Sequence, residues 1–323
     1  MRRLHRAVLI AVLVTVHLPH ATGPVTSAQS LPTEADLDQA SAGRMVTLGT
    51  PSTGRIVTIP LETYVARVVT GEAEPNAPAA AQQAIAVAIR TFAIVNARRH
   101  ARDGYGICDT THCQVPRAST AATRQAALAT AGRILLFEGA PAPVFYSANC
   151  GGQSETASEV WPGAHYPYLR SVGDDVHGDD VPWTLELTLE KIRTALVPAG
   201  FSGERLNGIE IESRNASGRV SRIRLDGLRP GSIAGDAFRM AIGPATVRST
   251  AFSFVSDRDV VRFTGRGYGH GVGMCVVGAA RRARRGENVI AILQAYYPGL
   301  TQASLDDLAV RTSLTGVPGL QGN

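Results

Sequence analysis

Two helical patterns separated by two prolines place the tightest constraint on the fold. The stretch "LETYVARVVTGEAE", which begins at Leu61, repeats apolar residues at helical spacing, and an Ala-rich segment from about Pro78 to His100 does so again. Pro75 and Pro78 stand between the two patterns. Because an internal proline removes a helical hydrogen bond and clashes with the preceding turn, one continuous helix is excluded. The sequence therefore predicts two helices that pack against each other.

Strand patterns lie on both sides of these helices. Alternation typical of strands occupies residues 45–48 and 55–59, and a further Ala-rich helix is predicted near 119–131. From residue 133 onward the pattern changes. Two apolar runs, 133–139 and 143–148, flank a Gly/Pro-rich turn and predict a hairpin.

A β-rich insert is predicted at about 183–255, with a helix at 189–196 and a second hairpin at 208–227. A strand at 259–264 then leads through a glycine-rich loop into C-terminal helices, the last at 289–297. The predicted class is α+β, in which a helical N-terminal part packs with hairpin-rich segments.

The N-terminus has the pattern of an export signal. Residues 1–28 combine a basic start, an apolar run and the small-residue site Thr26-Ser27-Ala28, which is typical of a secretory signal peptide. We expect residues 29–43 to form a flexible lead-in and residues 313–323 a disordered tail. No other apolar stretch approaches the ~18 residues that a membrane span needs, so no transmembrane anchor is expected after signal removal. The chain is expected to be exported, to the periplasm or the cell wall.

The charge of the chain argues against nucleic acid as a partner. The formal net charge is +5, and Arg2, Arg3 and Arg6 lie in the predicted signal peptide, so 5 − 3 leaves +2 on the remainder. A weakly basic chain lacks the electrostatic footprint of a nucleic-acid-binding protein.

The stretch "GRGYGHGVG" has glycine at every second position from 265 to 273. It lacks the Gly-Lys-Ser/Thr of a phosphate-binding loop and the acidic residue of a dinucleotide fold. Glycines this dense instead indicate a sharply turning backbone that a ligand can approach closely. His270 within it is either a hydrogen-bonding site residue or a structural histidine.

The stretch "CDTTHCQVPR" contains Cys108, His112 and Cys113. Their spacing is not a standard zinc-finger pattern, but His100 at the end of the long helix could supply a fourth zinc ligand. An exported chain permits a disulfide between the two cysteines just as readily. Both interpretations stay open on the residues alone.

Five segments, taken together, resemble the successive signatures of the SpoIID/LytB family. They are "LETYVARVVTGEAEPNAPAAAQQAIAVAIRTFA", "CDTTHCQVPR", "NCGGQSE", "YPYLRSV" and "GRGYGHGVGMCVVGAARRARRGENVIAILQAYYPG", in the family's order over roughly residues 60–300. The resemblance implies one SpoIID/LytB-like domain at 44–312. It also implies either a lytic transglycosylase of peptidoglycan glycan strands or a non-catalytic enhancer of a cell-wall amidase.

The resemblance places the catalytic acid at Glu72, in the pair Gly71-Glu72. A lytic transglycosylase protonates the glycosidic oxygen, and the 6-hydroxyl of muramic acid then attacks the anomeric carbon. Because the substrate supplies the nucleophile, one enzyme carboxyl suffices, unlike in ordinary glycoside hydrolysis. That carboxyl needs a desolvated setting that raises its pKa. Glu74 is a weaker rival, since no family position matches it.

Arg90 matches the family's second important position. Direct contact with Glu72 would lower the pKa of the acid, so we expect Arg90 to bind substrate, for example the lactyl carboxylate of muramic acid. The alternative is a structural ion pair. Tyr168 and Arg170 match a pattern in which lysine is more usual at the second place. Both are interpreted as cleft residues, and the alternative for Tyr168 is packing at a strand end.

The remaining expectations also depend on the resemblance. His270 and Tyr296 complete the expected substrate-binding set. Cys150 and His270 both lie in family motifs, so a thiol hydrolase that cleaves peptide is a further alternative. The sugar chemistry needs no cofactor. Some proteins of this family carry a His/Cys zinc site near "CDTTHCQVPR", which favours a structural zinc that holds this loop near Glu72.

Overall fold

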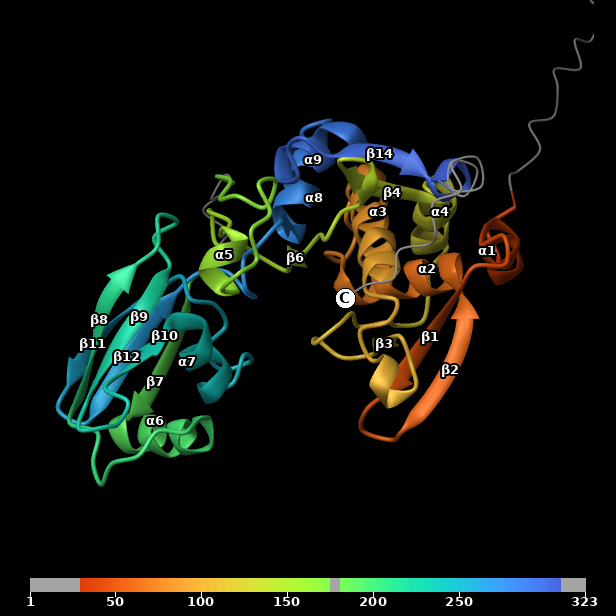
Figure 1. Cartoon of the computed structure of the whole chain (residues 1–323). Helices are drawn as coiled ribbons and strands as arrows, with labels where there is room; N and C mark the ends of the chain where they lie inside the picture. The colour runs from red at the N-terminus through yellow and green to blue at the C-terminus, as the bar shows by residue number, and fades with distance from the viewer. Residues whose placement is uncertain (1–29, 175–180, 309–323) are drawn as a thin grey trace, which may run out of the picture. The chain divides into compact units, whose positions relative to one another are not determined.

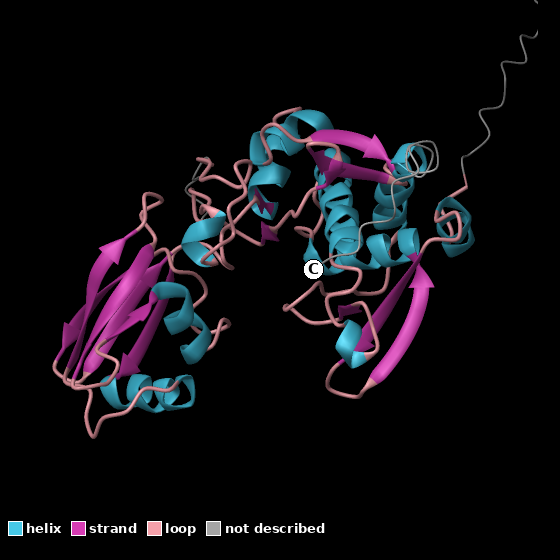
Figure 2. Cartoon of the chain, viewed as in Figure 1, coloured by secondary structure: helices cyan, strands magenta, loops and turns pink. Residues whose placement is uncertain are grey.

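The computed structural model describes residues 30–174 and 181–308, and it mixes helices and sheets (Figure 2). The predicted α+β class is confirmed. The predicted signal peptide, 1–28, and the predicted tail, 313–323, lie outside the described residues. Within the described part of the chain, no helix is long and apolar enough to cross a membrane.

Three helices form the centre of the N-terminal part, and all three were predicted, but the second ends at Val95 and not at His100. They are α2 (Leu61–Glu72), α3 (Ala79–Val95) and α4 (Ala121–Ala129), which all contact one another (Figure 1). Helix α2 ends at Glu72, and α3 begins directly after Pro78, where proline is tolerated because the first helical amides have no partner inside the helix. The buried faces of α2 and α3 contribute much of one hydrophobic core.

The predicted flexible lead-in at 29–43 is wrong over helix α1 (Glu34–Ala40). Thr33 caps this helix: its side chain accepts a hydrogen bond from the amide of Asp36, and the Asp36 carboxylate accepts one from the amide of Thr33. Leu37 is fully buried in the core. A capping box and a single apolar anchor are enough here because α1 packs against α2 and α4.

A small sheet brings the cysteine stretch beside these helices. Strands β1 (Met45–Thr50) and β2 (Arg55–Pro60) correspond to the two predicted strands and pair antiparallel. The short strand β3 (Ile107–Cys108) pairs in parallel with β1, with Cys108 opposite Gly49. The loop that follows β3 carries the rest of "CDTTHCQVPR".

The predicted hairpin of 133–139 with 143–148 is wrong. Strand β4 (Arg133–Phe137) pairs with β14 (Thr301–Ser304) and with the two-residue strand β5 (Ala140–Pro141). Strand β6 (Tyr146–Ser147) instead pairs in parallel with β13 (Met274–Cys275). Pro141 and Pro143 lack the amide hydrogens that a regular hairpin ladder needs, so both strands take distant partners.

Residues 183–265 form a β-rich part of the chain, in the region where the insert was predicted at about 183–255. Two three-stranded antiparallel sheets and two helices surround a separate hydrophobic core. The elements are β7 (Trp183–Thr188), α6 (Leu189–Leu196), β8 (Gly208–Arg214), β9 (Val220–Asp226), β10 (Ser232–Ala234), α7 (Gly235–Ile242), β11 (Phe252–Asp257) and β12 (Val260–Gly265).

The glycine stretch connects the insert to the C-terminal helices. Four glycines between β12 and β13 have positive φ angles, which other residues adopt only with strain: Gly267, Gly269, Gly271 and Gly273. Helices α8 (Val276–Arg284) and α9 (Val289–Tyr296) follow, and both pack against α3. The short helix α5 (Ala157–Val160) precedes the insert.

Candidate functional site

The carboxyl of Glu72 is held at the last residue of α2. The backbone amide of Val115 donates a hydrogen bond of 2.8 Å to its Oε1, and no described residue donates one to Oε2. Gly71 makes this contact possible, because a Cβ there would lie 1.8 Å from the carbonyl oxygen of Val115. The Gly-Glu pair therefore has a physical reason: glycine lets the loop after Cys113 lie against the helix end, and glutamate binds it.

Two phenols and an amide lie next to this carboxyl. Tyr64 on α2 donates its hydroxyl to Gln114 Oε1 at 2.7 Å, and Gln114 Nε2 donates to the hydroxyl of Tyr146 on β6 at 2.9 Å. Burial, with the negative charge of Glu72 as a further cause, raises the pKa of both phenols well above the ordinary value. Both phenols therefore stay protonated. None of these three residues was predicted as a site residue, although Gln114 lies in the stretch "CDTTHCQVPR".

The electrostatic setting of Glu72 suits an acid. Burial raises its pKa above the ordinary value, against the opposing effects of the Val115 hydrogen bond and of Arg117. The carboxyl is only half-buried, so it keeps access to a ligand. The rival Glu74 instead forms an ion pair of 3.2 Å with Arg284.

Arg90 is buried in an ion pair, which corrects the expectation that it lies where substrate binds. Its side chain is 0% exposed, and its Nε and Nη2 bind the carboxylate of Glu62 at 2.8 and 2.5 Å. A third nitrogen donates to the carbonyl of Arg133 at 2.9 Å. The structural ion pair, which was the alternative, is what the structure contains. Glu62 was missed because nothing in its local sequence marks it as the partner.

Two further expected cleft residues are buried. Tyr168 is 2% exposed and donates its hydroxyl to the carbonyl of Pro143 at 3.1 Å, so the packing alternative holds. Tyr296 is 1% exposed, and its hydroxyl donates to the carboxylate of Asp174 at 2.7 Å. Neither can contact a glycan strand as the chain is folded. Arg170 is exposed, so its side chain remains accessible to a ligand.

His270 is a neutral imidazole among aromatic rings. Its ring lies 5.0 Å from that of Trp161 and 6.4 Å from that of Phe145. The ring keeps some accessible surface, yet the surrounding protein lowers its pKa to about 3, mainly by burial and further through Arg239 and Arg219. Its Nδ1 accepts a hydrogen bond from the amide of Val272 at 3.0 Å, so Nε2 carries the proton.

The structure does not assemble a Cys150–His270 hydrolase pair. The thiol of Cys150 donates a hydrogen bond of 3.5 Å to the carboxylate of Asp174. The amide of Cys150 donates to the sulfur of Cys275, so the neighbour of Cys150 is Cys275 rather than His270. His270 Nδ1 is already occupied by the amide of Val272. A nucleophilic thiol needs a base within hydrogen-bond reach, and His270 does not fill that role.

His100, Cys108, His112 and Cys113 come together as one cluster. His100 Nε2 lies 3.3 Å from His112 Nδ1, and three sulfur–nitrogen distances within the cluster are 3.4, 3.6 and 3.7 Å. Tetrahedral zinc with ordinary bond lengths requires about 3.3 Å between two nitrogens and about 3.6 Å between nitrogen and sulfur. The four side chains thus fit a zinc ion. Cys108 and Cys113 are free thiols in this structure, as are Cys150 and Cys275.

Hydrogen bonds lower the pKa of one of these thiols. Burial opposes ionisation of Cys108, but hydrogen bonds with Thr110, Cys113 and His112 outweigh it and lower its pKa to about 6. Zinc binds the thiolate form of cysteine, so a thiol that ionises easily suits a ligand.

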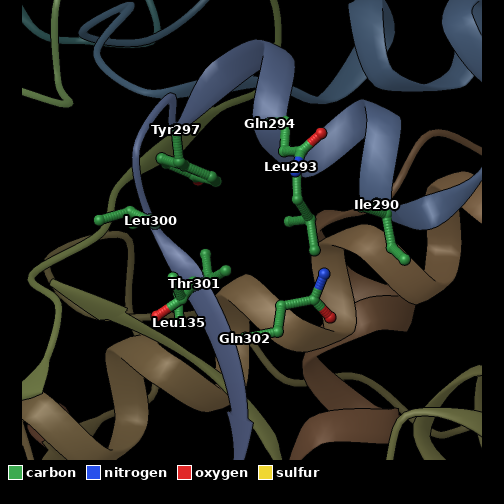
Figure 3. Close-up of a pocket in the computed structure, with 8 residues that line it drawn as sticks. All are labelled: Leu135, Ile290, Leu293, Gln294, Tyr297, Leu300, Thr301 and Gln302. Carbon is green, nitrogen blue, oxygen red and sulfur yellow. The ribbon is translucent and has the colours of Figure 1, made fainter. Parts of the chain in front are cut away.

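A pocket of about 300 Å³ lies elsewhere, between α9, β14 and β4 (Figure 3). Apolar and amide side chains dominate its lining: Leu135, Ile290, Leu293, Gln294, Tyr297, Leu300, Thr301 and Gln302. It contains no carboxylate, histidine or cysteine. The pocket therefore offers no acid for sugar chemistry, and Glu72 remains the candidate centre.

Comparison with known proteins shows to which protein family this fold and this site belong. The family described as Stage II sporulation protein, SpoIID, matches residues 50–137, the range that contains Glu72, Arg90 and the four-residue cluster. The chain belongs to the SpoIID/LytB family.

The names of two curated relatives match this family. The chain is 26% identical over 331 residues to Stage II sporulation protein D of Bacillus subtilis (strain 168), covering 93% of this chain and 92% of that protein. It is 27% identical over 275 residues to the Amidase enhancer of the same organism, covering 69% of this chain but 38% of that protein. An uncharacterized protein of Brachyspira hyodysenteriae is 30% identical to this chain over 245 residues. The alignment covers 74% of this chain and 66% of that protein.

Proposed function

We propose that this protein is an exported lytic transglycosylase that cleaves peptidoglycan glycan strands between muramic acid and glucosamine. The observation that carries the proposal is Glu72, a half-buried residue whose carboxyl is held through one oxygen by the amide of Val115 and forms no ion pair with an arginine among the described residues. Membership of the SpoIID/LytB family supports cell-wall chemistry as its setting.

The geometry of Glu72 suits a single acid that becomes a base. The Val115 amide donates to Oε1, so the proton of the neutral acid belongs on Oε2. Glu72 gives that proton to the glycosidic oxygen as the bond from this oxygen to the anomeric carbon breaks. The 6-hydroxyl of the muramic acid then attacks the same carbon, and its proton returns to the Glu72 carboxylate. A 1,6-anhydro sugar and a new chain end leave, and the acid is restored.

A structural zinc ion held by the four-residue cluster is part of this proposal. Cys113 lies two residues before Val115, whose amide holds Glu72. Zinc bound by His100, Cys108, His112 and Cys113 would therefore keep Val115 in place and stabilise the loop against the end of α2. The ion would be structural, because all four coordination positions are filled by protein.

One observation favours a second function. The relative named Amidase enhancer shares 27% identity over 275 residues with this chain. The alternative is thus a non-catalytic protein that binds the wall and stimulates an N-acetylmuramoyl-L-alanine amidase. In that case Glu72 would serve the fold alone, and the amidase would be the partner.

A matched pair of variants separates the two functions. Purified glycan strands, with and without stem peptides, are incubated with the protein, and 1,6-anhydromuramic products are measured by mass spectrometry. Glu72→Gln removes the acid at constant shape, whereas Glu74→Gln removes a carboxylate two residues away that pairs with Arg284.

A transglycosylase should lose its products with Glu72→Gln and keep them with Glu74→Gln. Absence of anhydro products from the folded wild-type protein on both kinds of strand would reject the enzymatic proposal. An amidase assay then decides the alternative, since an enhancer should stimulate an amidase equally well as Glu72→Gln.

A further inference from the structure

Two further cysteines lie together outside the four-residue cluster. Cys150 and Cys275 are each 2% exposed. The parallel pairing of β6 with β13 sets Ser147 opposite Cys275, and the chain then turns back so that the amide of Cys150 lies 3.2 Å from the sulfur of Cys275. The proposed sugar chemistry uses neither thiol.

Cys275 occupies a position where sulfur is not the expected atom. It is the N-cap of α8, and its Sγ accepts a hydrogen bond from the amide of Gly278 at 3.3 Å. Helix N-caps favour serine, threonine, aspartate and asparagine, whose oxygens accept far better than a thiol. Serine would cap α8 better in the same space. The sulfur therefore calls for a role other than capping.

The surroundings of the two thiols argue against a second metal site. Cys150, Asp174 and Cys275 bring their ligand atoms within 4.8 Å of one another, but they supply only three ligands, whereas the other cluster supplies four. A closed structural zinc site takes four protein ligands. The carboxylate of Asp174 is already engaged, since the hydroxyl of Tyr296 donates to it at 2.7 Å and Cys150 donates at 3.5 Å.

We propose that Cys150 and Cys275 form a disulfide when the protein folds in an oxidising compartment. The thiolate of one cysteine attacks the disulfide of a small or protein oxidant and releases one oxidant thiol. The second cysteine, as its thiolate, then displaces the other oxidant thiol from the mixed disulfide. Two protein thiols are oxidised to one disulfide, and one oxidant disulfide is reduced to two thiols.

The bond would link the segments that lie before and after the β-rich insert. Cys150 precedes the insert, and Cys275 follows it after the glycine stretch. The insert already contacts this point, because Arg219 donates to the carbonyl of Cys150 at 2.7 Å. A cross-link here closes a long loop, and cross-links that close long loops restrict the unfolded chain most. This inference does not depend on the proposed transglycosylase activity.

The test compares the wild-type protein with Cys275→Ser. Serine keeps an acceptor at the N-cap of α8, so the variant should fold, but it cannot form the bond. Both proteins are refolded with a mixture of oxidised and reduced glutathione, and thermal unfolding is then measured with and without the phosphine reductant TCEP. Free thiols are counted after unfolding in a chelator, and a digest without reductant is examined by mass spectrometry.

We expect two free thiols in the wild type, those of Cys108 and Cys113, and a linked 150/275 peptide two hydrogens lighter than its parts. TCEP should lower the Tm of the wild type by about 5 to 15 °C and leave that of Cys275→Ser unchanged. Four free thiols in the refolded wild type would overturn the proposal. So would a second zinc ion per chain by elemental analysis, or an equal effect of TCEP on both proteins.

Discussion

Replacing Arg90 by methionine is expected to destabilise the fold strongly while leaving the chemistry at Glu72 unchanged. The side chains of Arg90 and Glu62 are 0% and 1% exposed. Methionine keeps much of the volume of Arg90 but removes the cation. Glu62 would then be buried with only the amide of Gly132, at 3.0 Å, as a remaining hydrogen-bond donor.

The magnitude follows from this burial. Breaking a buried ion pair by removing one partner costs about 3 to 5 kcal/mol, because an uncompensated charge stays in the interior. For a domain of this size such a loss lowers Tm by about 10 °C. In the double variant Arg90→Met/Glu62→Leu no charge is left unpaired. Its cost should be only about 1 to 3 kcal/mol, since the carbonyls of Arg133 and Ala127 still lose a donor.

Urea unfolding of the wild type, both single variants and the double variant gives the coupling free energy. We expect the double variant to be more stable than Arg90→Met. Product formation per folded molecule, measured well below Tm, should be unchanged in the double variant. If Arg90→Met were as stable as the wild type and instead raised KM for glycan strands, Arg90 would bind substrate and the structural interpretation would fail.

The other predictions concern Glu72, the neighbouring Gly71 and the four-residue cluster. Because burial raises the pKa of Glu72, its protonated form persists to higher pH than that of an ordinary glutamate, and kcat/KM should fall as pH rises through this raised value. The same shift means that Glu72 stabilises the fold at low pH and that this contribution is lost as pH rises, so urea unfolding of Glu72→Gln should lack that loss. Gly71→Ala would place a Cβ 1.8 Å from the carbonyl oxygen of Val115. We expect the free energy of unfolding to fall by about 1 to 3 kcal/mol and product formation to be at least about tenfold lower. Wild-type activity of this variant would refute the role given to the glycine. Cys113→Ser should bind less zinc by elemental analysis and unfold at lower temperature, yet retain product formation per folded molecule at low temperature; an unchanged Tm would argue against a structural ion.

Local patterns in the sequence predicted much of the helical part. The break at Pro75 and Pro78, the strands before α2 and the helix α6 in the insert all depend on periodicity and backbone chemistry within a few residues. The cluster of His100, Cys108, His112 and Cys113 was also predictable, because three of its members lie within six positions. The capping box that begins at Thr33 can also be recognised in the sequence, and taking it into account would have predicted helix α1.

The sequence by itself determined which groups are candidates for chemistry: a Gly-Glu pair and a stretch in which histidine and cysteine are close together. Only the tertiary structure decided which partners those groups have. Arg90 pairs with Glu62, 28 residues away, while Glu72 receives the amide of a residue 43 positions away and, among the described residues, no arginine. Strand β4 likewise takes β14 as its partner from the far end of the chain. The physical reason is the same in each case, because burial and electrostatic pairing depend on distances in space, and these are set by packing between segments that local sequence patterns do not relate.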